Sequence, residues 1–175
     1  MFLLIYMKFN IIATTDRGLE IQACNELKSL LKDLGDSNAI VNTTNILGLI
    51  IAETSLDPFK IIEDLKKIYI ENPDKIFYLK RVIPIQIVTE TNIEKILEAT
   101  LPLINSIKEN ETFRITVEKR RTNISSMDII KAVANLVNRK VDLEKPDKII
   151  LIEIIGKYTG ISIIKSNQIF NVHKL

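Results

Sequence analysis

The sequence predicts an α+β fold in two successive parts, residues 1–88 and residues 89–175. In the first part, segments with strand and helix periodicity follow in the order β-α-β-β-α-β, which is typical of a ferredoxin-like domain. In the second part, a helix precedes a strand, another helix and two more strands. The linker between the parts is short and not rich in Gly or Ser, so we expect two domains that pack rigidly together.

The first part contains six predicted elements. They are a strand at 8–15, a helix at 17–34, strands at 39–43 and 47–53, a helix from 58 to about 70 and a strand at 77–88. Gly35 is placed to end the first helix. Asp57 is a candidate N-cap for the second helix, with Pro58 at its first position. Pro84 predicts an edge position or a bulge in the last strand, since proline donates no hydrogen bond to a sheet.

The second part begins with a helix that Asn92 caps and that Pro102 is expected to kink or split. Alternating Phe113, Ile115 and Val117 then predict a strand with one apolar face. The remaining elements are a helix that begins near residues 125–126, a strand at 149–155 and a strand at 158–164. A corner at 143–146 and a turn around 156–157 connect them.

Positive charge is concentrated between residues 111 and 140. The whole chain has a net charge of +2, whereas this stretch carries seven basic and three acidic residues, a net charge of +4. A basic triplet at a strand end is by itself usually a solvated surface. Here it enters a helix, where free backbone N–H groups also favour phosphate. The candidate RNA-binding residues are Arg114, Lys119, Arg120, Arg121, Asn123, Lys131, Arg139 and Lys140.

The same stretch resembles the THUMP domain, an RNA-binding module of tRNA-modifying enzymes. The matching segments are F-R-I-T-V-E-K-R-R at the entry to the helix, I-I-K-A-V-A-N-L-V, and V-D-L-E-K-P-D before the final strands. Such domains commonly follow a ferredoxin-like domain. Within the family, the chain resembles the accessory subunit of tRNA cytidine acetyltransferase. The resemblance implies an accessory protein that holds the acceptor end of tRNA for an acetyltransferase, whose chemistry uses acetyl-CoA and ATP.

Motifs for catalysis or cofactor binding are not recognisable in the sequence. The single histidine, His173, lies near the end of the chain, and no glycine-rich nucleotide loop occurs. Cys24 is the only cysteine, which excludes an intramolecular disulfide or a cysteine zinc site and favours the reducing cytoplasm. A catalytic domain would not fit beside the two predicted domains. We therefore expect no enzymatic activity, no metal and no cofactor.

Two alternatives stay open at this stage. The chain could be an RNA-binding module for another tRNA modification enzyme, a methyltransferase or a thiolation enzyme. It could also be a self-associating protein whose basic residues are incidental; the sequence does not specify an oligomeric state. The opening segment MFLLIYM, residues 1–7, is too short to span a membrane and lacks the features of a signal peptide, and Met7 is a second candidate start.

Overall fold

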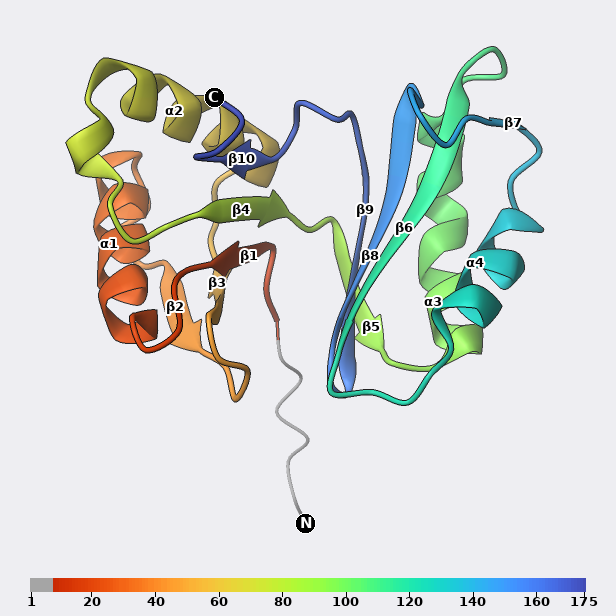
Figure 1. Ribbon diagram of the computed structural model, residues 1–175, viewed down its shortest axis with the longest axis horizontal. Coiled ribbons are helices and arrows are strands. Elements are labelled where there is room, and N and C mark those ends of the chain that lie inside the picture. The colour runs from red at the N-terminus through yellow and green to blue at the C-terminus, as the bar shows by residue number, and fades with distance from the viewer. Residues whose placement is uncertain (1–7) are drawn as a thin grey trace.

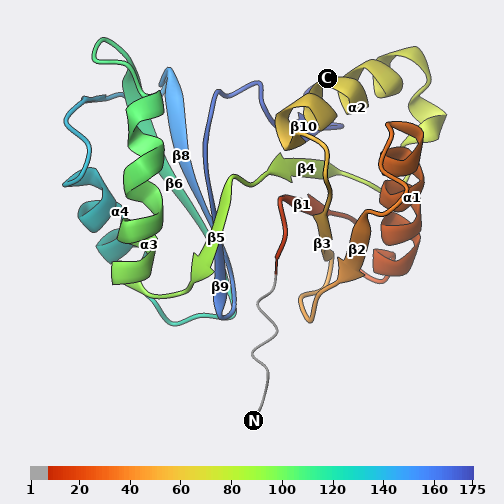
Figure 2. The same cartoon turned by 180° about the vertical axis from the view of Figure 1, so that it is seen from behind.

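The computed structural model contains two five-stranded sheets that share a core between them (Figure 1). It describes residues 8–175, so the interpretation of the opening segment lies outside the described residues. The helices lie on the outer faces of the two sheets, as the view from behind also shows (Figure 2). The α+β class is therefore confirmed.

The first sheet is a ferredoxin-like β-α-β-β-α-β unit with one additional strand. Its strand order is β10-β4-β1-β3-β2, and all its pairings are antiparallel. Its elements are β1 (Ile11–Thr14), α1 (Glu20–Asp33), β2 (Ile40–Thr43), β3 (Leu49–Glu53), α2 (Pro58–Glu71), the short helix η1 (Pro73–Lys75), β4 (Arg81–Pro84) and β10 (Phe170–Asn171). The side chain of Asp57 accepts a hydrogen bond from the Phe59 N–H, which confirms the predicted cap of α2.

The second sheet has the order β5-β9-β8-β6-β7, with β6 parallel to both β7 and β8. Its elements are β5 (Ile87–Glu90), α3 (Ile93–Thr100), the short helix η2 (Leu101–Ser106), β6 (Thr112–Arg120), α4 (Ser126–Ala134), β7 (Lys140–Val141), β8 (Lys148–Ile155) and β9 (Tyr158–Ile164). The predicted kink or split of the helix is confirmed as a split, since α3 ends at Thr100 and Pro102 lies in the first turn of η2. The longest helices of the described chain have 14 residues, and none is long and apolar enough to cross a bilayer.

The predicted single strand at 77–88 is wrong. The chain leaves the first sheet after Pro84 and enters the second sheet at Ile87. Gln86 marks the crossing: its N–H donates to the Ile161 carbonyl, and its Oε1 accepts from the Ile163 N–H at 2.7 Å. The predicted domain boundary between residues 88 and 89 therefore falls within β5.

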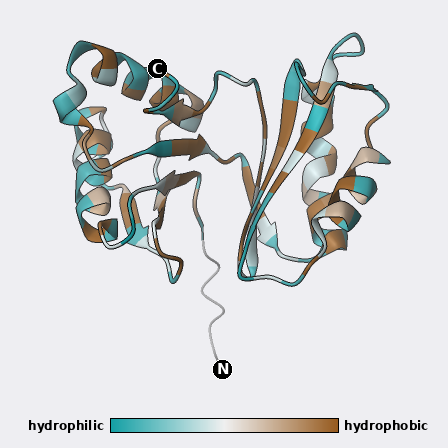
Figure 3. Ribbon diagram, viewed as in Figure 1, coloured by the Kyte–Doolittle hydropathy of each residue, from teal (hydrophilic) through white to brown (hydrophobic). Residues whose placement is uncertain are grey.

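The two sheets contact each other through a shared apolar layer. Ile12, Ile51 and Ile83 of the first sheet pack in one cluster with Ile149 and Leu151 of β8. Both faces of β8 are covered, because its alternate residues pack against α3 and α4, and the strand is hydrophobic along most of its length (Figure 3). Burial on two faces explains its nearly unbroken apolar sequence.

The end of the chain returns to the first sheet. After β9, the chain crosses back and β10 pairs with β4, so that Phe170 lies opposite Val82. Phe170 is fully buried, and its ring meets Tyr69 of α2 edge-on at 5.8 Å between centroids. The two sheets are thus connected twice, by Gln86 and by residues 165–169.

Candidate nucleic-acid interface

The junction between β6 and α4 is a tight, capped turn. Arg121 follows the last strand residue with φ of 54°, and it is the only non-glycine residue of the described chain at positive φ. Ser125 then caps α4, as its Oγ accepts a hydrogen bond from the Asp128 N–H. Arg121 and Asn123 are exposed here, so their side chains are available to a ligand.

Strand alternation separates the three consecutive basic residues. Phe113, Ile115 and Val117 pack in the core beneath α3 and α4, which places Lys119 on that same side. The Lys119 ammonium donates to the Ile124 carbonyl at 3.1 Å and is otherwise exposed. Arg120 lies on the opposite face, toward the first sheet.

Arg120 has a structural partner. Its Nη1 donates to Oε2 of Glu153 at 2.7 Å, and Glu153 is fully buried between the sheets. Burial raises the pKa of Glu153, and the positive charge of Arg120 opposes that shift. Only 21% of the Arg120 side chain is exposed, so Arg120 is not simply a solvated surface residue like Arg121. Its role in RNA binding stays a prediction.

Three of the candidate residues lie at the opposite end of β6. Arg114 donates from Nη1 to the Leu143 carbonyl at 2.9 Å, and Arg139 donates from Nε to the Lys108 carbonyl at 3.0 Å. Lys140 is exposed on β7. Arg114 and Arg120 are six residues apart, or roughly 20 Å along a strand. The predicted basic cluster is therefore divided between two ends of one sheet, with Lys131 exposed on α4.

The junction also includes a residue that sequence reasoning missed. Lys157 is exposed in the turn between β8 and β9, and the neighbouring Gly156 N–H donates to the Arg120 carbonyl at 2.8 Å. The parallel pairing of β6 with β8 brings this turn to the junction. We define the junction site as Lys119, Arg121, Asn123 and Lys157.

Other chemistry is sparse in the part of the chain that the structure describes. Residues 8–175 contain no group of three or more His, Cys, Asp or Glu side chains placed to hold a metal ion. His173 is exposed, and its backbone N–H donates to the side chain of Asn171.

Comparison with known families matches residues 90–164 to the THUMP domain. The match begins at Glu90, the last residue of β5, and ends with β9, so it covers the second sheet except most of β5, together with its helices. The chain contains a THUMP domain. The junction site lies within this THUMP domain, and the ferredoxin-like unit precedes it, in the order that the sequence predicts.

Similar proteins are longer than this chain. The uncharacterized protein MJ0421 of Methanocaldococcus jannaschii is 32% identical over 162 residues, which are 90% of this chain but only 41% of that protein. The crystal structure of PH1313 from Pyrococcus horikoshii superposes with a TM-score of 0.70 at 21% identity, over 90% of this chain and 55% of the other. This chain thus spans about half, or less, of these relatives.

Two further solved structures share the fold of the THUMP domain and its N-terminal unit. A 4-thiouridine synthetase in complex with RNA and ATP has a TM-score of 0.57 at 11% identity, covering 94% of this chain and 42% of the other. TrmN from Thermus thermophilus has a TM-score of 0.58 at 14% identity, and the match covers 89% of this chain and 45% of TrmN. At such identities the likeness concerns the fold.

Proposed function

We propose that the protein binds tRNA through its THUMP domain and presents it to a tRNA modification enzyme. The observation that carries this proposal is the position of the exposed junction site inside the segment that matches the THUMP domain. The RNA bound in the 4-thiouridine synthetase structure supports it, since that protein shares the fold. Lysine and arginine side chains at the junction would contact phosphates, and so read backbone shape more than base identity.

Within this proposal the chemistry belongs to a partner enzyme, and the first candidate is a tRNA cytidine acetyltransferase. The motif resemblance supports that candidate, whereas the methyltransferase and thiolation alternatives draw on the fold shared with TrmN and the 4-thiouridine synthetase. Holding one end of the tRNA would make delivery of the distant base effectively intramolecular. The protein would therefore raise the activity of its partner without a catalytic group of its own.

The proposal predicts that the protein lowers the apparent KM of the acetyltransferase for whole tRNA. Holding the tRNA raises the local concentration of the target base at the enzyme, which lowers the apparent KM. The chemical step is unaffected, so kcat should change little. Acetylation is measured with and without the protein, on whole tRNA and on an RNA truncated to the modified arm. Equal stimulation on both RNAs would contradict the role in presentation, and stimulation of a methyltransferase instead would assign a different partner.

Binding of tRNA should be direct and dependent on salt. Contacts to about three to five phosphates give a log–log salt slope of roughly −2 to −4. Arg121→Gln should weaken binding by about 1–3 kcal/mol and make the slope shallower by about 1, because it removes one exposed charge at the junction. Lys28→Gln, an exposed change on α1, is the matched control. An affinity for tRNA that does not change with salt concentration would exclude electrostatic binding to the phosphates.

A further inference from the structure

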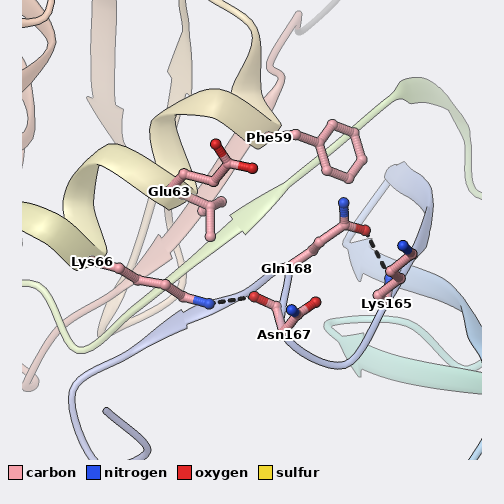
Figure 4. A pocket seen from close by; sticks show the side chains of 7 residues that line it. Phe59, Glu63, Lys66, Lys165, Asn167 and Gln168 are labelled. Carbon is pink, nitrogen blue, oxygen red and sulfur yellow. Dashed lines mark hydrogen bonds between the residues drawn. The ribbon is translucent and has the colours of Figure 1, made fainter.

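Two adjoining cavities lie where α2 meets the segment that follows β9, and Figure 4 shows the larger of them. We call them the seam cavities. The larger has a volume of about 370 Å³ and the smaller about 160 Å³. Lys66 of α2 and Asn167 line both, and the Lys66 ammonium donates to the Asn167 carbonyl. The cavities therefore sit at the connection between the ferredoxin-like unit and the THUMP domain.

The smaller seam cavity is lined by three cations and no acidic side chain. The cations are Lys66, Arg81 and Lys174, which come from three separate segments. None of them forms an ion pair with an acidic residue in the described chain. Three positive charges from separate segments attract a negatively charged group such as a phosphate.

Arg81 has unused hydrogen-bonding capacity. Its Nε is buried and has no hydrogen-bond partner among the described residues. The charge of Arg81 acts weakly on Glu153, but the hydrogen bond of that carboxylate goes to Arg120. Ser166, Asn167 and Asn171 add neutral groups at the wall of the cavity. This combination of cations with hydroxyl and amide groups suits the oxygens of a phosphate.

The two cavities differ in size and polarity in a way that suits one nucleotide. The smaller lies below the roughly 300–1,000 Å³ of most small-molecule pockets, so it fits a phosphate group better than a whole nucleotide. The larger has the Phe59 ring on one side and Gln168 on the other (Figure 4). Glu63 and Lys165 also line it, and the Glu63 carboxylate can accept a hydrogen bond from a base or a ribose.

We propose that the seam cavities bind one nucleotide of the RNA. Its phosphate lies among Lys66, Arg81 and Lys174, and the attached nucleoside lies against Phe59 in the larger cavity. The identity of the ligand as RNA rests on the proposed function, whereas the phosphate chemistry rests on the cavity itself. The RNA-binding surface then extends from the THUMP domain onto the ferredoxin-like unit.

The test compares two charge-matched double variants in tRNA binding. Lys66→Gln with Lys174→Gln removes two seam cations, while Lys67→Gln with Lys28→Gln removes two exposed cations that line neither cavity. The seam variant should bind tRNA about 10- to 100-fold more weakly, with a salt slope shallower by about 1. The control variant should match the wild type.

The outcomes separate this inference from the proposed function. Wild-type protein that fails to bind tRNA at low salt contradicts the proposed function. If the wild type binds tRNA and the seam variant binds it equally well, only the seam site is overturned. The same holds if both double variants lose binding to the same extent. Amide NMR shifts of Ser166 and Asn171 on addition of adenosine monophosphate, combined with unchanged tRNA binding by the seam variant, would assign the cavities to a free nucleotide and overturn the RNA assignment.

Discussion

Arg120→Ala should lower the free energy of unfolding by about 3–5 kcal/mol, the usual cost of removing one partner from a buried ion pair. The carboxylate of Glu153 is fully buried, and its hydrogen bond from Arg120 is the only one recorded for it within residues 8–175. Its second oxygen, Oε1, already has no partner among these residues. Without Arg120 the charge would be buried with no hydrogen bond at all.

Chemical and thermal unfolding measure this effect. The expected loss corresponds to roughly 6–20 °C in Tm for a protein of this size. Arg121→Ala is the matched control and should unfold much like the wild type, because its side chain is exposed. The double variant Arg120→Ala, Glu153→Gln should recover part of the loss, since the buried group is then neutral. Equal effects of the two single arginine variants would contradict the structural role of Arg120.

The same pair predicts a pH dependence of stability. Burial raises the pKa of Glu153 above its ordinary value of 4.5, so the folded state binds the proton more tightly than the unfolded state does. Its contribution to stability is therefore complete below about 4.5 and is lost as the pH rises through the raised pKa. Glu153→Gln should remove that decline. In Arg120→Ala the decline should grow, because the opposing positive charge is gone.

Phe170→Ala should destabilise the protein by about 3–5 kcal/mol, as expected for loss of a buried aromatic side chain. Phe170 is fully buried in the core beneath α1 and α2, and it contacts Tyr69. Its removal would leave a cavity and loosen the pairing of β10 with β4. Urea unfolding gives the loss in stability, and hydrogen exchange at the Val82 amide reports on β4.

Phe77→Ala provides the control for this experiment. The Phe77 ring is 69% exposed and packs edge-on against Tyr78, so its loss should cost far less. Phe170→Leu should cost less than the alanine change, because it fills more of the cavity. If Phe170→Ala and Phe77→Ala proved equally mild, β10 would contribute little to the fold.

Long, periodic elements could be predicted from the sequence, and short ones could not. The helices α1 and α2 carry several turns of amphipathic pattern and clear end signals, and they form within a few residues of the expected limits. The strands β7 and β10 have two residues each, too few to show a period. The break at Gln86 depends on a partner in β9, and local sequence does not contain that partner.

The sequence predicted where the candidate site lies, but not which of its side chains are free to bind a ligand. Its location at the β6–α4 junction follows from consecutive residues. Which side chains are free depends on pairing across the sheet: Glu153 engages Arg120, and the register of β8 brings Lys157 to the junction. Neither relation is visible along the sequence, because the partners are more than 30 residues away.

The return of β10 to the first sheet also sets an order of events during protein synthesis. Val82 of β4 pairs with Phe170, which the ribosome adds to the chain about 90 residues later. At about 5–20 residues per second this interval is roughly 5–20 s. During that time one edge of β4 is unpaired, as an exposed strand edge that invites association with other chains. Completion of the N-terminal unit thus becomes a late step, coupled to emergence of the whole THUMP domain from the ribosome.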